Sequence, residues 1–482
     1  MLFSSLIFLV FFLPAVLIPY YTILRNHRKA QNGFLLVASL GFYAWGEPWF
    51  VLVLMLSIIG NWAFGLLIDK HRQNQQLARF SIVLMLIFNL TIIFIFKYLM
   101  FTLTNINKLF GSDFNIIHIV LPIGISFFTF QAISYVIDVY RGHGGVQKNP
   151  LNVGLYITFF PQLIAGPIVR YETIADQIMN RKETMQDFSE GVCRFLIGFG
   201  KKILLANNFA IIADKAFNMP GTELSVSFAW MGAIAYTLQI FFDFSGYSDM
   251  AIGLGKMFGF HFLENFNYPY ISKSISEFWR RWHISLATWF RDYVYFPMGG
   301  SRVSSKGRLV FNLFVVWALT GLWHGANWTF ICWGLFYFTF ITLEKLTGFE
   351  SLGGQRFGVK LVKRVYTLLL VIFGWVLFRS TSISLAIAYL KTMLFMGSVE
   401  ILDANTMVYF AENKVFFLFG ILMSMPLIKM ISTPLNEKFR KGNRLIDSFV
   451  NIAYPTALLL FFIIAISYLV KGSYNPFIYF NF

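Results

Sequence analysis

The sequence contains few charged residues. Asp, Glu, Lys and Arg make up 13% of its 482 residues, whereas hydrophobic residues make up 57%. A soluble domain has about a quarter charged residues, so this composition excludes a large water-facing surface. The apolar residues also occur in long runs, and a run of about 20 residues spans the hydrocarbon core of a bilayer. We therefore expect a multi-pass membrane protein whose surroundings are the lipid bilayer.

Several familiar signatures are also missing. The chain has two cysteines, Cys193 and Cys332, which form neither a disulfide framework nor a metal-binding spacing. There is no HExxH sequence, no P-loop and no GxGxxG sequence after a strand. We accordingly predict no metal site and no permanently bound cofactor. Because there is also no fixed-period repeat and no long soluble segment, we predict one domain over 1–482.

The net charge of +16 would suggest nucleic acid binding in a soluble protein. In a membrane protein, basic residues collect in cytoplasmic loops and set the orientation. Arg25 and Arg28 lie in one such loop, and Lys70 and Arg72 lie in the next. We therefore predict no nucleic acid partner. The apolar segments predict an all-α polytopic protein with about nine to twelve crossings, some of them re-entrant or half-helices.

The stretch 261–308 departs from the apolar pattern because it mixes aromatic and basic residues. Such a composition suits the membrane interface, with rings at headgroup depth and basic tips in water. One interpretation is a cytoplasmic anchor that follows the distribution of positive charge. The other is a surface that binds a polyanionic donor such as coenzyme A by charge-assisted contacts. The candidates for donor binding are Arg280, Arg281, Arg291 and Trp282.

The apolar segment 309–343 that follows is 35 residues long, and its flanks are basic. Two full crossings need about 40 residues, so we expect either two short spans or a broken, re-entrant element. Near its middle, Gly321 and Gly325 bracket His324. Glycine lets another group approach closely, and irregular backbone at that depth must line protein or a watery cavity.

Among the seven histidines, His283 and His324 are the candidates for chemistry. An ionisable residue in an apolar segment is a functional-site hypothesis, although His324 could also be a histidine hydrogen-bonded between helices. Imidazole is a natural general base near neutral pH, and moving an acyl group from a thioester to a hydroxyl requires one. Asp292 and Asn327 are supporting polar candidates.

Ser245 lies in a polar run, 243–249, inside the apolar segment 226–257. The run lacks the glycine two residues before the serine that a nucleophile elbow needs. We therefore interpret it as a polar, glycine-containing break in the segment.

Several motifs together resemble those of the bacterial membrane-bound O-acyltransferases, and most resemble the branch that O-acetylates alginate. The matches extend over nearly the whole chain. They include Leu121-Pro122-Ile123-Gly124, Phe242-Asp243-Phe244-Ser245-Gly246, Pro269-Tyr270-Ile271-Ser272, Glu277-Phe278-Trp279-Arg280-Arg281-Trp282-His283, Arg291-Asp292-Tyr293 and Gly321-Leu322-Trp323-His324-Gly325-Ala326. The region 261–345 carries the catalytic motifs.

The resemblance implies transmembrane helices around a central funnel or tunnel, with His324 as the catalytic histidine and His283 as a second functional position. It implies a multi-pass protein of the bacterial cytoplasmic membrane that takes acetyl from acetyl-CoA and passes it outward. An exported acetyltransferase partner would then act on an extracytoplasmic polysaccharide, alginate or another surface glycan. The alternatives are D-alanyl or other acyl transfer to an envelope polymer, and a transporter, since broken helices with a polar centre also suit transporters.

Overall fold

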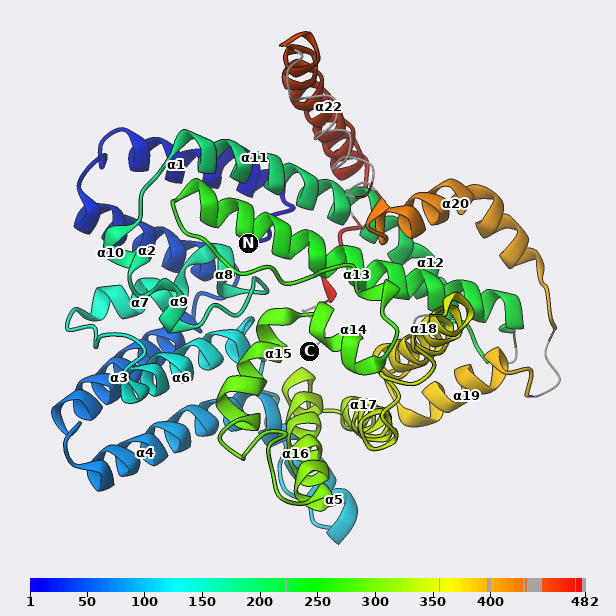
Figure 1. Cartoon of the computed structure of the whole chain (residues 1–482), viewed down its shortest axis with the longest axis horizontal. Coiled ribbons are helices and arrows are strands. Elements are labelled where there is room, and N and C mark those ends of the chain that lie inside the picture. Colours follow the sequence, from blue (N-terminus) through cyan, green and yellow to red (C-terminus); the bar gives the residue numbers. More distant parts are fainter. Residues whose placement is uncertain are drawn as a thin grey trace. The chain divides into compact units, whose positions relative to one another are not determined.

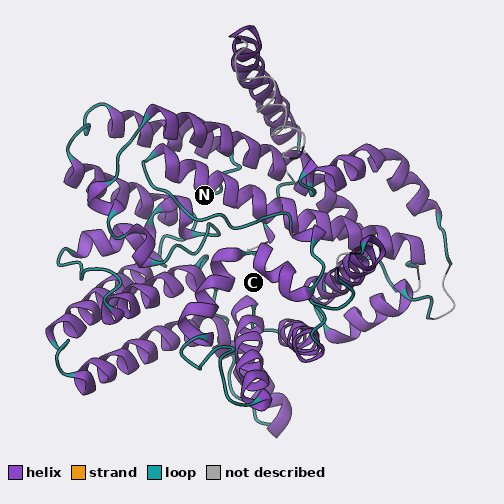
Figure 2. Ribbon diagram, viewed as in Figure 1, coloured by secondary structure: helices purple, strands orange, loops and turns teal. Residues whose placement is uncertain are grey.

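The computed structural model describes residues 1–221, 223–354, 356–396, 400–427, 430, 444–472 and 474–478. These residues form helices and loops and contain no strand (Figure 2). The predicted all-α fold is confirmed. The chain divides into two compact units. Unit 1 comprises Met1–Phe195 and Tyr247–Leu263, and unit 2 comprises Leu196–Gly246 and Glu264–Phe482. That 1–482 forms one domain stays a prediction.

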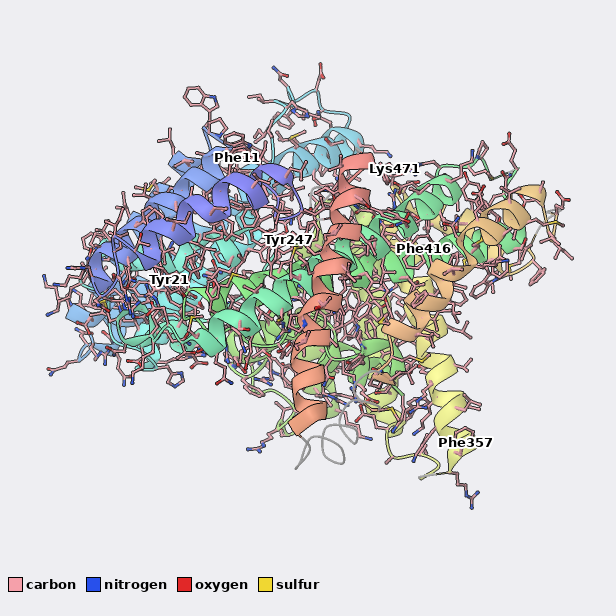
Figure 3. The ribbon with its side chains drawn as sticks, turned by 90° about the horizontal axis from the view of Figure 1, so that it is seen from above. Phe11, Tyr21, Tyr247, Phe357, Phe416 and Lys471 are labelled. Atoms are coloured by element: carbon pink, nitrogen blue, oxygen red, sulfur yellow. The ribbon has the colours of Figure 1, made fainter. Side chains whose placement is uncertain are left out.

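Eight helices in the described part of the chain are long and apolar enough to cross a membrane: Val51–Lys70, Gln75–Phe110, Met185–Phe217, Val226–Met257, Trp328–Thr347, Phe357–Arg379, Ala404–Met423 and Ile452–Lys471. Two shorter apolar helices are Phe8–Tyr21 and Ile383–Met393. Large apolar side chains cover their outer surfaces. Phe11 is 69% exposed and Phe357 is 78% exposed (Figure 3). Such surfaces suit contact with lipid, which has no polar groups to offer in its core.

Unit 1 is a set of helices joined by short loops: η1 (Phe8–Phe12), α1 (Leu13–Tyr21), α2 (Arg28–Ala44), α3 (Val51–Lys70), α4 (Gln75–Ile93), η2 (Phe94–Tyr98), α5 (Leu99–Phe110), α6 (Ile125–Arg141), α7 (Pro150–Thr158), α8 (Phe160–Leu163), α9 (Tyr171–Ile174), α10 (Gln177–Asn180) and most of α11 (Met185–Gly200) (Figure 1). Helices α3, α4 and α6 pack against one another. Asn61 and Asn89 are buried between α3 and α4 and exchange hydrogen bonds of 3.0 and 2.8 Å. Such polar pairs fix the register of helices that lipid would not otherwise hold together.

A buried ionic network ties together the ends of several unit 1 elements. The guanidinium of Arg181 is fully buried and donates hydrogen bonds to the Tyr20 hydroxyl at 3.2 Å and to the carbonyl oxygens of Phe258 and Ile178 at 3.1 and 2.7 Å. The carboxylate of Glu183 accepts from Tyr20 and forms an ion pair with Arg28. Buried charges persist when opposite charges and hydrogen bonds satisfy them.

Unit 2 holds the remaining elements: the end of α11, η3 (Lys201–Ala206), α12 (Asn207–Phe217), most of α13 (Val226–Met257), η4 (Pro269–Ile271), α14 (Ile275–Arg281), α15 (Ile284–Phe290), η5 (Arg291–Tyr295), α16 (Lys306–His324), α17 (Trp328–Thr347), α18 (Phe357–Arg379), α19 (Ile383–Met393), α20 (Ala404–Met423) and α22 (Arg444–Lys471) (Figure 1). Helices α16, α17 and α18 pack in sequence order, and α14 packs on α17 and α18.

The polar run 243–249 is not a break, and that interpretation was wrong. Helix α13 continues unbroken from Val226 to Met257. A Cβ atom on Gly246 would lie 2.8 Å from the carbonyl oxygen of Gly198 and 3.2 Å from the Cβ atom of Lys201. The glycine therefore permits close packing of α13 against the end of α11, a usual role of small residues between membrane helices.

Hydrogen bonds to side chains fix the start of α14. The Ser274 hydroxyl accepts from the backbone N–H of Glu277 at 2.9 Å, which is an N-cap. The Glu344 carboxylate of α17 accepts from the N–H groups of Ile275 and Ser276 at 2.7 and 3.0 Å. Two contacts from a neighbouring helix thus determine where α14 begins and hold it on α17.

Several aromatic side chains of this stretch do not lie where the interface interpretation placed them, whereas Phe296 is 56% exposed. Phe278, Trp282 and Trp289 are buried, at 0, 3 and 5% exposure. Their rings pack into the core of unit 2, because α14 and α15 are too short to stand alone and must bury their apolar faces.

Candidate active site

Helices α16 and α17 pack against each other as a helical hairpin (Figure 1). His324 is the last residue of α16. Residues 325–327 make the turn, and α17 begins at Trp328. The Asn327 side chain accepts from the Thr329 N–H at 3.1 Å, which caps α17, and donates to the Thr381 carbonyl oxygen at 3.1 Å. The segment 309–343 therefore consists of two helices joined by a short turn. They reach beyond the apolar run because Lys306, Arg308 and Lys345 also belong to them.

Two glycines allow α16 and α17 to pack closely in the part of the hairpin near His324. A Cβ atom on Gly321 would lie 2.6 Å from the Phe330 carbonyl oxygen, and one on Gly334 would lie 2.5 Å from the Trp317 carbonyl oxygen. Real Cβ atoms do not approach backbone that closely. The two helices can cross this closely only because Gly321 and Gly334 have no side chain.

The imidazole of His324 lies among aromatic rings. Its centroid is 4.9 Å from Trp323, 4.8 Å from Trp333 and 5.1 Å from Phe378, in edge-on arrangements. The residue is 6% exposed. Three aromatic rings therefore border the buried imidazole.

His283 connects α14 to α15 and has left-handed backbone dihedral angles, φ 46° and ψ 53°. Such angles are uncommon for residues other than glycine and concentrate at functional sites. Its side chain is buried, with Nδ1 3.3 Å from Asn265 Oδ1 and the ring edge-on to Phe244 at 4.5 Å. His283 lies outside the eight candidate membrane helices, and burial lowers its pKa to about 3. It is therefore neutral at physiological pH.

Both histidines line one small cavity in unit 2. The cavity has a volume of about 20 Å³, room for about one water-sized group. Its walls are formed by Ile240, Asp243, Phe244, Trp279, Trp282, His283, His324, Trp333, Trp375, Phe378 and Ile478. The two candidate histidines, which are far apart in sequence, thus contribute to the same cavity.

A second, polar cavity of unit 2 shares Phe378 and Ile478 with the histidine cavity. Its volume is about 390 Å³, and Asn327, Arg379 and Asp214 are among its lining residues. Arg379 and Asp214 form an ion pair of 2.6 Å. A polar chamber thus lies directly beside the cavity that holds the histidines, with two apolar side chains bordering both.

The predicted donor-binding arginines do not line either cavity. Arg280 pairs with Glu350 at 2.8 Å, Arg281 with Glu277 at 2.9 Å, and Arg291 with Asp292 at 2.7 Å. Of the predicted donor-binding residues, only Trp282 reaches the histidine cavity. Of the two supporting candidates, Asp292 is the partner of Arg291, and Asn327 lines the polar cavity.

Sequence reasoning missed most of the cavity wall. Trp375 and Phe378 on α18 have the three-residue spacing that places two rings on one helix face. That spacing was a usable signal. Asn265 and Ile478 carried no local signal, because their relation to His283 and to the cavity depends on folding.

Comparison with known proteins then decides the family. The profile of the membrane-bound O-acyltransferase family matches residues 38–383. The chain belongs to this family. It is a multi-pass membrane protein and an acyltransferase, as its motifs predicted.

Relatives from several bacteria are similar over part or all of the chain. "Probable alginate O-acetylase AlgI" of Pseudomonas putida is 40% identical, and the alignment covers 100% of both chains. "Peptidoglycan O-acetyltransferase" of Helicobacter pylori is 33% identical over 100% of this chain and 98% of the relative. "Teichoic acid D-alanyltransferase" of Bacillus subtilis is 35% identical, but over 46% of this chain and 58% of the relative. These relatives carry the names of different acceptors.

Proposed function

We propose that this acyltransferase takes acetyl from a cytoplasmic thioester, acetyl-CoA, and delivers it outward for O-acetylation of an extracytoplasmic polysaccharide. The acceptor would be alginate or another surface glycan, reached through an exported acetyltransferase, and the membrane would be the bacterial cytoplasmic membrane. The observation that carries this proposal is the small, aromatic-walled cavity shared by His283 and His324. A cavity with room for about one water-sized group does not accommodate a long acyl chain, and acetyl is a small acyl group.

The reaction needs a nucleophile, a base and a leaving group. The acceptor hydroxyl oxygen attacks the thioester carbonyl carbon, the C–O bond forms, and the C–S bond breaks. The hydroxyl proton passes to an imidazole nitrogen, and from there to the departing thiolate, so that coenzyme A leaves as the thiol. We assign the base role to His324, because its imidazole lies beside the rings of Trp333 and Phe378 in the cavity that it shares with His283.

The arginines of α14 and η5 have a separate role in this proposal. Arg280 and Arg291 are exposed, and their guanidinium groups can bind the phosphates of coenzyme A bidentately. Each already pairs with a carboxylate, so a donor would have to exchange partners with Glu350 and Asp292. Trp282 lines the histidine cavity and is thus placed to contact the acyl end of the donor.

The identity of the donor is the direct test. Purified protein in liposomes is incubated with acetyl-CoA, and separately with the D-alanyl thioester of a carrier protein, in the presence of a hydroxyl acceptor. We expect thiol release from acetyl-CoA that is lost in His324→Ala and retained in His118→Ala, which alters an exposed loop histidine. Consumption of the D-alanyl thioester alone would overturn the proposal in favour of D-alanyl transfer, the activity named for the Bacillus subtilis relative.

A further inference from the structure

The loop before α14 makes a set of hydrogen bonds with the start of α15 in unit 2. The Asn265 carbonyl oxygen accepts from the Ile284 N–H at 2.9 Å, and the Asn267 N–H donates to the Arg281 carbonyl oxygen at 2.9 Å. The Asn265 side chain is buried, and its Oδ1 accepts from the N–H and the hydroxyl of Ser285 at 3.1 and 2.9 Å. One residue thus holds both residues that follow His283.

These contacts determine the orientation of the Asn265 amide. Amide oxygen and nitrogen atoms are assigned from their hydrogen-bond partners. A backbone N–H can only donate, so the Asn265 atom 3.1 Å from the Ser285 nitrogen must be the oxygen. The same oxygen lies 3.3 Å from His283 Nδ1.

The tautomer of His283 follows from this assignment. Because an amide oxygen has no proton, the hydrogen bond forms only when His283 Nδ1 carries one. A neutral imidazole has one N–H, so the lone pair then lies on Nε2, the nitrogen on the ring edge turned away from Asn265. The ring that bears it lines the cavity shared with His324.

The backbone of His283 requires the same support. Its left-handed conformation persists in a residue with a side chain only when the surroundings hold it. The hydrogen bonds from Ile284 and Ser285 to Asn265 hold the two residues that follow it. Asn265 therefore constrains both the ring and the chain that presents it.

We propose that Asn265 is a positioning residue of the acyl transfer site: it holds His283 in the Nδ1–H tautomer, so that Nε2 serves as the acceptor toward the reacting groups. This rests on the proposed function only as far as His283 takes part in the transfer. Asn265 itself touches no reacting atom and acts through the imidazole.

Two substitutions separate orientation from folding. Asn265→Leu keeps the approximate volume but removes the acceptor, and we expect kcat for acetyl-CoA to fall about tenfold or more while the donor KM stays within about twofold. Asn265→Asp keeps an acceptor for Nδ1 but adds a negative charge, which stabilises the imidazolium. Its kcat should be largely retained, while the acid limb of the pH–kcat profile moves to higher pH, because His283 now protonates at a higher pH than in the wild type.

A matched control lies in the same loop. Asn267 is exposed and uses its backbone atoms in this region, so Asn267→Ala should have wild-type kcat and pH dependence. A folded Asn265→Leu protein with wild-type kcat would overturn the proposal. If Asn265→Leu does not accumulate in the membrane, Asn265→Asp is used in its place. A pH–kcat profile of Asn265→Asp that is identical to that of the wild type would then overturn the proposal.

The tautomer can also be measured without activity. Nitrogen chemical shifts of histidine-labelled protein distinguish Nδ1–H from Nε2–H, and the His283 signals are identified by their loss in His283→Gln. We expect the Nδ1–H form, and an Nε2–H form would contradict the role of Asn265. If the wild type releases no thiol from acetyl-CoA, the proposed function fails by itself, and this measurement still tests Asn265.

Discussion

Two regions of the chain bury ionisable side chains, and the surroundings of these side chains differ. In unit 1, the Arg181 guanidinium is surrounded by carbonyl oxygens, the Tyr20 hydroxyl and the nearby Glu183 carboxylate. In unit 2, His283 and His324 share a cavity whose walls are mostly aromatic and aliphatic. The first region stabilises a permanent charge with hydrogen bonds. The second places two histidines among rings and aliphatic side chains, beside Asp243, which forms a buried ion pair of 2.6 Å with Lys202.

This difference distinguishes a buried residue that stabilises the fold from buried residues that suit proton transfer. A guanidinium that never releases its proton is useful as a link between loops and helix ends. A neutral imidazole held between rings can accept a proton and return it within one reaction. The comparison predicts that damage to the network in unit 1 removes folded protein, whereas damage near the cavity removes activity first.

The largest effect on stability is expected from Arg181→Met. The substitution keeps much of the side chain but leaves Tyr20, Glu183 and two carbonyl oxygens without their shared donor. Each buried acceptor that loses its donor costs about 1–3 kcal/mol, while Arg28 still pairs with Glu183. Thermal unfolding in detergent should show a large fall in Tm together with a low membrane level. Arg79→Met, at an exposed position, is the control, and equal Tm values for the two variants would contradict the comparison.

We expect Gly321→Ala to lower Tm less than Arg181→Met does. We expect it to lower the rate of acyl transfer more than it lowers stability. The added Cβ atom would lie 2.6 Å from the Phe330 carbonyl oxygen, so α16 must shift relative to α17 and carry His324 with it. Overpacking of this kind costs about 1–3 kcal/mol.

The matched control for Gly321→Ala is Gly307→Ala on the same helix, where the Cβ atom meets nothing within 4 Å. That change should be neutral, or stabilising by up to about 1 kcal/mol through helix propensity. Thiol release from acetyl-CoA is measured for both variants. If both retain wild-type rates, the close crossing of α16 and α17 does not set the position of His324.

Local sequence patterns predicted the helices and the two histidines, but not how the histidines are surrounded. His283 and His324 stood out because an ionisable residue next to apolar or aromatic sequence is costly unless it is used. Asn265 gave no such sign, since its partner lies 18 residues along the chain. Ile478 comes from the far end of the sequence and reaches the cavity only through tertiary packing.

The two misinterpretations have a common cause. A glycine within a polar run predicted a break in the segment 226–257, but close packing of α13 on α11 uses that glycine instead. Trp and Phe among basic residues predicted interfacial rings, but the rings of Phe278 and Trp282 pack into the core. In both cases the same residues suit two environments, and contacts distant in sequence decide between them.

The most direct test of the central claim is the amount of polysaccharide-bound acetate in cells that carry wild type, His324→Ala, His283→Ala or His118→Ala. Membrane levels and Tm are measured for each protein, so that loss of folding is separated from loss of chemistry. We predict that His324→Ala abolishes the bound acetate and His283→Ala lowers it strongly, while His118→Ala retains it. Wild-type acetate in cells that carry folded His324→Ala would contradict the assignment of this cavity as the acyl transfer site.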